Sequence, residues 1–173
     1  MNKRYKTIYA DPPWWIEAGG PKRGANWHYP LMRTEDICAL PVKDLADKDA
    51  HLYLWTTNAA FPEALTVIRA WGFKYITCIT WVKNTVGFGQ YFRGMTEHCL
   101  FARRGMPPPK MEDGHRVQGR TVFFAKRTVH SRKPKEMREI IERVSYGPRL
   151  ELFAREQHDG WDVWGNEVDG IKF

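Results

Sequence analysis

Short apolar runs alternate along the chain with segments of helical periodicity, and this alternation restricts the fold more than any other feature. Runs rich in β-branched and aromatic residues predict strands at residues 7–10, 51–55, 75–82, 99–102, 122–125 and 149–154. Helical patterns occupy 58–71, with Asn58 as the candidate N-cap, and 134–147. Strands that alternate with helices form a sheet with helices packed on its faces. We therefore expect an α/β sandwich, and the 173 residues suit a single domain over 1–173.

The composition is that of a globular protein, with 43% hydrophobic and 27% charged residues. Its apolar runs are far shorter than the roughly 20 residues that a membrane span needs. The N-terminal residues lack the apolar run and small-residue cleavage site of a secretory signal. The three cysteines stand far apart in the sequence, which indicates neither a metal site nor a disulfide framework. These features predict a cytoplasmic protein with no membrane partner.

Basic and aromatic residues are both abundant. Lys and Arg number 27 against 20 Asp and Glu, and the chain holds eight tryptophans. A basic surface favours a polyanion, and aromatic rings suit stacking on unpaired bases. The alternative is that the rings fill the core and the charge keeps the protein in solution. Three stretches without periodicity, 16–32, 84–96 and 103–120, are long enough to be functional loops, and the basic loop 103–120 is the candidate track for nucleic acid.

The sharpest local feature is Asp11-Pro12-Pro13-Trp14, directly after the first predicted strand. Ligands of α/β sheets bind beyond the carboxyl ends of the strands, so the motif lies where a site is expected. The prolines stiffen the backbone and lack N–H donors, so we expect an array of unanswered acceptors. This array consists of the Asp11 carboxylate and nearby carbonyl oxygens, with the Trp14 ring beside it.

Such an array suits a planar group whose amine must act as a nucleophile. The exocyclic amine of a nucleobase reacts poorly because its lone pair is delocalised into the ring. Acceptors for both N–H groups draw that pair back and stabilise the positive charge that grows during attack on a methyl donor. We expect Trp14 to stack on the base and hold it at attack distance. The structural alternative is a Pro-Pro turn with a buried tryptophan.

The motif Asp11-Pro12-Pro13-Trp14 resembles the catalytic motif of the MT-A70 family of S-adenosylmethionine-dependent adenine-N6 methyltransferases. Further segments resemble that family in order along the chain: Thr80-Trp-Val-Lys-Asn84, Glu97-His-Cys-Leu100, Ser131-Arg-Lys-Pro134, residues 141–155, Trp164-Gly-Asn-Glu167 and Asp169-Gly-Ile171. The resemblance implies a Rossmann-like methyltransferase sandwich of permuted order, in which the catalytic motif precedes the donor-binding half. The absence of a G-x-G-x-x-G sequence agrees with this order.

The resemblance also implies three groups of site residues and no metal. One group would bind the adenine amine and support the base: Asp11, Pro12, Pro13 and Trp14. Another matches positions at the target nucleoside or its entrance: Tyr29, Glu97, Lys133 and Arg132. The last would hold S-adenosylmethionine, chiefly through its ribose and adenine: Asp11, Arg155, Asn166 and Glu167.

Some of these residues have simpler interpretations. Glu97 is equally a strand-end charge paired with Arg93 or Arg103, and Lys133 a solvated lysine in the first turn of a helix. Asn166 also suits an ordinary turn. Glu167 stands where the family has glutamine, which replaces an amide with an acceptor-only carboxylate.

Two further departures from the family concern the pocket and its entrance. Arg132 stands in place of a histidine. Only ten residues precede Asp11, so we expect the wall beside the cofactor's adenine to be missing or rebuilt from residues 3–7.

The expected function is methyl transfer to adenine N6 in DNA, as a monomer or homodimer with a partner subunit left open. RNA is the nearest alternative substrate. An enzyme that methylates glutamine amides would carry Asn-Pro-Pro in place of Asp11-Pro12-Pro13. A catalytically silent nucleic-acid-binding subunit would have no reason to keep the motif. Because a paired adenine must be flipped out of the duplex at a cost of roughly a few kcal/mol, we expect a preference for single strands.

Overall fold

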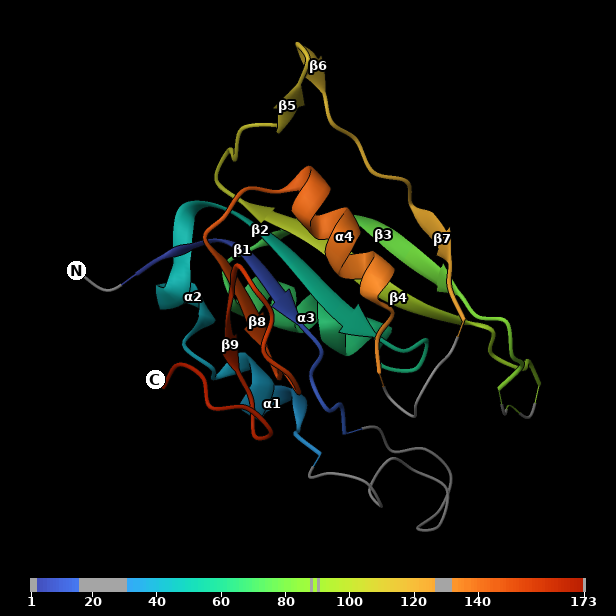
Figure 1. Cartoon of the computed structure of the whole chain (residues 1–173). Coiled ribbons are helices and arrows are strands. Elements are labelled where there is room, and N and C mark those ends of the chain that lie inside the picture. Colours follow the sequence, from blue (N-terminus) through green and yellow to red (C-terminus); the bar gives the residue numbers. More distant parts are fainter. Residues whose placement is uncertain (1–2, 16–30, 88, 90, 127–131, 173) are drawn as a thin grey trace.

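The computed structural model describes residues 3–15, 31–87, 89, 91–126 and 132–172. In these residues, seven strands form a central sheet in the order β7-β3-β4-β2-β1-β8-β9 (Figure 1). The strands are β1 (Tyr5–Ala10), β2 (Ala46–Thr56), β3 (Lys74–Val82), β4 (Thr96–Arg104), β7 (Val122–Phe124), β8 (Arg149–Leu152) and β9 (Trp161–Trp164). Within this sheet β4 runs antiparallel to its neighbours β2 and β3, and the other pairs are parallel. The predicted Rossmann-like α/β sandwich is confirmed, and the Asp11-Pro12-Pro13-Trp14 motif directly follows its first strand.

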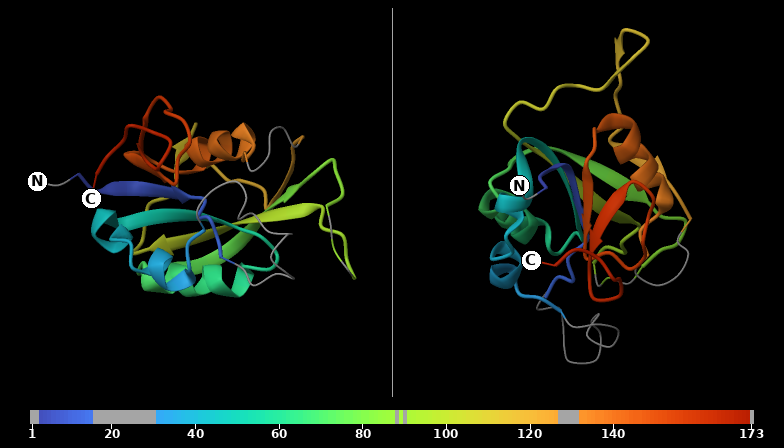
Figure 2. Two further views of the ribbon diagram at one scale, coloured as in Figure 1. Left: turned by 90° about the horizontal axis from the view of Figure 1, so that it is seen from below. Right: turned by 60° about the vertical axis from the view of Figure 1, so that its left-hand side comes forward.

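Helices cover both faces of the sheet (Figure 2). One face carries α1 (Thr34–Cys38), α2 (Val42–Leu45) and α3 (Phe61–Ala70), and the other carries α4 (Lys135–Val144). The first face encloses a cluster that includes Ile8 of β1, Leu54 of β2 and Ile68 of α3. The second encloses Tyr9, Trp55 and the α4 side chains Met137 and Ile141. None of the helices in the described part of the chain is long and apolar enough to span a bilayer.

The first strand is buried on both faces because it lies in the middle of the sheet. It pairs with β2 on one side and β8 on the other. Ile8 and Ala10 are fully buried against the α3 side, while Tyr9, 3% exposed, faces α4 and accepts a hydrogen bond from Trp55 Nε1 at 2.6 Å. Lys6 is the one exposed residue of this strand, and the apolar run expected of a parallel strand covered on both faces is confined to Ile8, Tyr9 and Ala10. The residue that follows it is thereby held in a fixed position.

Several local expectations were wrong. Asn58 does not cap the helix after β2: α3 begins at Phe61 with Ala60 at its N-cap, and the Asn58 amide oxygen lies 2.6 Å from His98 Nε2. The helices α1 and α2, of five and four residues, are too short to show a period in the sequence. The edge strand β9 was also missed.

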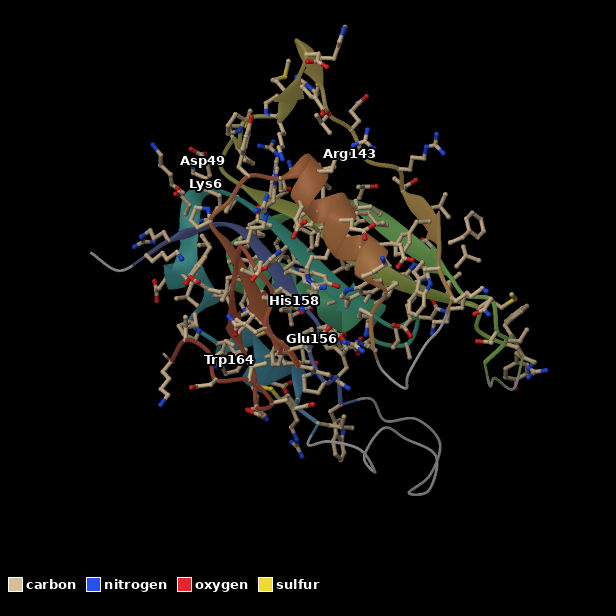
Figure 3. All side chains as sticks on the ribbon, viewed as in Figure 1. Lys6, Asp49, Arg143, Glu156, His158 and Trp164 are labelled. Carbon is tan, nitrogen blue, oxygen red and sulfur yellow. The ribbon has the colours of Figure 1, made fainter. Side chains whose placement is uncertain are left out.

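The basic loop 103–120 begins at the end of the sheet opposite the Asp11-Pro12-Pro13-Trp14 motif. Arg104 pairs with Ala50 early in β2, whereas Ala10 pairs with Leu54 towards its carboxyl end. The loop carries a small hairpin, β5 (Met111–Glu112) and β6 (His115–Arg116), which projects at the top of Figure 1. Figure 3 shows Lys6 and Asp49 at this end of the sheet, with Trp164 and Glu156 at the other. The hairpin therefore lies at the opposite end of the sheet from the motif, although the chain after it returns to β3, where Thr121 O accepts a hydrogen bond from Thr80 N–H at 2.8 Å. The expectation that this loop is a track for nucleic acid stays a prediction.

Candidate active site

Asp11 lies directly after β1, at the carboxyl end of the sheet. Its side chain is 28% exposed, so it is accessible although its surroundings are largely protein. The paired strands on each side of β1 fix the backbone that carries it. In parallel α/β sheets this end of a central strand is where ligands bind.

The prolines after Asp11 do form a constrained turn, but their carbonyl groups are not unanswered. Pro12 O accepts a hydrogen bond from Trp14 N–H at 3.0 Å, and Pro13 O accepts one from Met32 N–H at 2.8 Å. The prediction of unanswered acceptors considered only the N–H donors that proline lacks and overlooked the Trp14 and Met32 amides. Each carbonyl oxygen has a second lone pair, so it can still accept a hydrogen bond from a ligand.

Trp14 is an anchor of this turn. Its side chain is 9% exposed, and its indole N–H donates to the Trp55 carbonyl oxygen at 3.0 Å. The bond joins the motif to the end of β2. The structural alternative of a buried tryptophan therefore describes this ring, and with so little of it exposed we assign Trp14 an anchoring role in place of stacking on a base.

Four charged side chains of alternating sign meet beside the motif, and we call them the ion cluster: Asp11, Lys133, Glu97 and Lys83. Lys133 Nζ donates to Asp11 Oδ2 at 2.7 Å and lies 3.4 Å from Glu97 Oε2. Lys83 Nζ forms an ion pair with the other Glu97 oxygen, Oε1. The four side chains are between 16% and 28% exposed. The alternatives of a solvated Lys133 and of Glu97 paired with an arginine are therefore wrong.

Aromatic rings support both lysines of the ion cluster. Lys133 Nζ lies 5.3 Å from the centre of the Trp55 ring, and Lys83 Nζ lies 5.1 Å from that of Trp81. Ring faces attract cations, more strongly where water is partly excluded. The lysines of the ion cluster thus contact aromatic rings of β2 and β3.

The two carboxyl groups of the ion cluster are shifted in opposite directions. Burial raises the pKa of Asp11 above its usual range, although the Lys133 ammonium opposes that shift. Burial also acts to raise the pKa of Glu97, but Lys133 and Lys83 outweigh it and hold this pKa below its usual range. Lys133 is the cation common to both carboxyl groups.

A cavity of about 400 Å³ opens on the other side of the motif. Its walls combine the motif, the segment after β8 and the segment after β9: Asp11, Pro12, Pro13, Met32, Phe153, Ala154, Arg155, Trp164, Gly165, Asn166 and Glu167. All four residues expected to hold S-adenosylmethionine are among them. Residues 3–7 are not among these walls, so of the two alternatives for the wall beside the cofactor's adenine, rebuilding from residues 3–7 is excluded and a missing wall stays a prediction.

The wall after β8 has an unusual backbone. Phe153 adopts a φ of +63°, a left-handed conformation that a bulky residue rarely takes. Its ring meets Trp164 edge to face, with ring centres 5.3 Å apart. At the neighbouring Gly165, a Cβ atom would lie 2.2 Å from the Ala154 carbonyl oxygen, so only glycine fits there. Strain of this kind occurs where function requires a particular geometry.

The remaining predicted residues lie around these two features. Arg155 Nε lies 3.8 Å from Glu167 Oε1 at the cavity wall. Arg132 is 54% exposed and forms an ion pair with Glu156 of the segment after β8. Tyr29 lies outside the described residues.

Three residues of the site were not predicted from the sequence. Lys83 belongs to the segment 80–84 but had no expected role, although a lysine directly after an apolar strand was a usable signal. Phe153 was expected only as a strand residue and Trp164 only as part of the segment 164–167, and no sequence signal placed their rings in the cavity wall.

Comparison with known proteins agrees with this geometry. The model of the MT-A70 family matches residues 5–167. The chain belongs to the MT-A70 family. It is similar to the Type II methyltransferase M.MunI of Mycoplasma sp, with 31% identity over 191 residues, covering 98% of this chain and 80% of that protein.

Eukaryotic relatives match over a smaller part of their length. The chain is 31% identical to the N(6)-adenosine-methyltransferase MT-A70-like protein of Drosophila melanogaster and 30% identical to the human N(6)-adenosine-methyltransferase catalytic subunit METTL3. These alignments cover 98% and 97% of this chain but 28% and 29% of the relatives. The chain therefore spans less than a third of the length of these two proteins.

The ion cluster predicts a measurable electrostatic effect of Lys133. Lys133→Met removes the ammonium and keeps most of the side-chain length, so the pKa values of both Asp11 and Glu97 should rise. Two partly buried carboxylates also lose a charged partner, which should lower the free energy of unfolding at neutral pH by about 1–3 kcal/mol. Carbon-13 NMR titration of the carboxyl groups and chemical denaturation measure the two effects.

Lys135→Met is the matched control, because this lysine is 79% exposed and pairs only along α4 with Glu139. It should leave the Asp11 pKa unchanged. An Asp11 pKa that is the same in Lys133→Met as in the wild type would contradict the proposed coupling.

Proposed function

We propose that the chain transfers a methyl group from S-adenosylmethionine to the exocyclic N6 of adenine in a nucleic acid, with DNA as the favoured substrate. The observation that carries this proposal is the position of Asp11. Its carboxyl group belongs to the ion cluster on one side and lines the cavity on the other. A group placed in this way can contact a target amine and a methyl donor together.

The cavity fits the methyl donor by its chemistry. Arg155, Asn166 and Glu167 would hold S-adenosylmethionine, since asparagine both donates and accepts and a carboxylate accepts from ribose hydroxyls. Phe153 and Trp164 add apolar surface for its flat parts. When bound, S-adenosylmethionine supplies a methyl group activated by a positively charged sulfur.

The motif is suited to the target amine. The Asp11 carboxylate and the second lone pairs of Pro12 O and Pro13 O offer acceptors on a backbone held by Trp14 and Met32. Acceptors fixed in place favour the positive charge that develops on an attacking nitrogen, because no reorganisation is needed during the reaction. Lys133 helps to keep Asp11 ionised for this role. Asp11 need not act as a base, since the alkylated nitrogen can lose its proton afterwards.

The share of each relative that the chain covers favours DNA over RNA as the substrate. The chain covers 80% of a Type II methyltransferase but only 29% of the human N(6)-adenosine-methyltransferase catalytic subunit. RNA remains the second candidate, because the latter proteins are named for adenosine. The complete Asp11-Pro12-Pro13-Trp14 motif weighs against a silent binding subunit.

The direct test uses the chain with S-adenosylmethionine and three substrates: single-stranded DNA, the same DNA as a duplex, and RNA. Nucleoside mass spectrometry should find N6-methyladenine, with single-stranded DNA modified faster than the duplex because flipping costs roughly a few kcal/mol. Equal rates on strand and duplex would contradict the flipping argument. Methylation of RNA alone would replace DNA as substrate, and no methylated nucleoside would indicate a binding subunit.

Asp11→Asn tests the role of the carboxylate. The substitution keeps the size of the side chain but removes its charge, so the transfer rate should fall about a hundredfold or more. Binding of S-adenosylmethionine, measured by calorimetry, should change only a few-fold. Asp113→Asn is the control, because Asp113 lies in the exposed β5–β6 turn at a φ of +48°, which asparagine tolerates. An Asp11→Asn variant with wild-type turnover would remove Asp11 from the reaction.

A further inference from the structure

Two neighbouring aromatic side chains stand out on the surface. Tyr91 and Phe92 are each 92% exposed, the highest values among the large apolar residues of the described structure. Single apolar side chains on a surface are ordinary, but two adjacent rings almost wholly in water indicate an interaction site. The proposed chemistry at Asp11 does not use them.

The two rings lie near the end of a hydrogen-bonded extension of the β3–β4 hairpin, which we call the aromatic arm (residues 83–87, 89 and 91–95). Lys83 N–H donates to Met95 O at 2.8 Å, and further out Gly87 N–H donates to Gly94 O at 2.7 Å. Arg93 Nε also donates to Gly87 O at 3.0 Å. Three hydrogen bonds thus join the two strands of the arm, and it extends beyond the sheet in the left view of Figure 2.

The aromatic arm leaves the sheet at the ion cluster. Its first residue, Lys83, pairs with Glu97, which lies just beyond its last residue and contacts Lys133. The rings therefore lie outward from the end of the sheet that carries Asp11. A strand whose adenine reaches Asp11 can pass its neighbouring nucleotides along this side.

The form of the aromatic arm favours nucleobases over a protein surface. A stable protein interface buries about 800 Å² on each partner, much more than two side chains on a narrow arm supply. A base needs only one ring face, and stacking needs no sequence-specific hydrogen bonds. The neighbouring Arg93 adds a positive charge, as suits a phosphate backbone. The chain as a whole is basic, with a formal charge of +7.

We propose that Tyr91 and Phe92 stack on unpaired bases that flank the target adenine. This inference rests on the proposed function and adds a binding subsite for the substrate strand. It also gives a physical reason to prefer single strands, because paired bases do not offer their faces to a ring at the side.

The first measurement is the affinity of the full chain for a fluorescein-labelled single strand of about 12 nucleotides with one adenine, by fluorescence anisotropy. The double variant Tyr91→Leu/Phe92→Leu keeps apolar bulk but removes both rings, and should bind about tenfold more weakly. Tyr91→Trp/Phe92→Trp should retain the affinity. Tyr75→Leu is the control, because Tyr75 is 38% exposed near the start of β3, at the far end of the same strand.

Strands with an abasic residue at successive positions distinguish a loss of stacking from a structural effect of the two substitutions. At one or two positions beside the adenine, loss of the base should weaken wild-type binding about as much as loss of the rings. In the double leucine variant the same abasic residue should cost almost nothing, because the partner is already absent. Additive losses, or unchanged affinity of the double leucine variant, would overturn the proposal.

Two further readouts distinguish a loss of stacking from a loss of catalysis and from a change of oligomeric state. Methyl transfer by the wild type to an adenine-containing trinucleotide tests the proposed function separately, so failure of the wild type in this assay counts against the proposed function and not against stacking. A wild type that binds no single strand overturns the stacking proposal. Sedimentation tests for a change of oligomeric state. If the wild type is a dimer and the double leucine variant a monomer, with unchanged strand affinity, the aromatic arm is an interface between copies. That result would also overturn the stacking proposal.

Discussion

The contact between Asp11 and Lys133 holds the candidate site together. It joins residues that are 122 positions apart. Asp11 lies at the end of the central strand β1, and Lys133 lies just before α4. Placing charges where water is limited is unfavourable, and here the cost is offset by alternation of sign and by aromatic rings under both lysines. Lys133 contacts both Asp11 and Glu97, so its removal takes a cationic partner from each of these carboxyl groups. The ion cluster therefore restrains the end of β1, the start of β4 and the approach to α4 together.

This restraint places the motif between two different environments. On one side lie the charged groups, and on the other lies a cavity with aromatic and polar walls. The cavity depends on close backbone contacts, since Gly165 touches Ala154 and Phe153 is held in a left-handed conformation. The permuted order follows directly, because the strand that carries the motif comes first and the cavity walls are completed by segments after β8 and β9.

The sequence was sufficient for features that depend on local pattern. The first strand, the helix α4 and the strand β8 are periodic or apolar enough to be identified, and the motif after β1 marked the correct end of the sheet. The family resemblance identified Asp11, Arg155, Asn166 and Glu167 as residues that would bind the cofactor, and all four line one cavity. Short helices such as α2 have too few turns for a period, which is why they were missed.

Tertiary contacts decided the features that sequence left open. Glu97 had several possible cationic partners, and only the register of β3 with β4 and the position of the segment before α4 bring Lys83 and Lys133 to it. Trp14 was equally suited to stacking or to burial, and its bond to the Trp55 carbonyl group settled the matter. Asn58 has a side chain that can cap a helix, but its amide oxygen instead lies within hydrogen-bond distance of His98 on β4.

The most direct test of the whole account is a crystal structure of the chain with a non-transferable S-adenosylmethionine analogue and an adenine-containing single strand. The account predicts the adenine N6 within hydrogen-bond distance of the Asp11 carboxylate and the analogue in the cavity beside Asn166. An adenine bound away from Asp11, or an analogue bound outside that cavity, would contradict it.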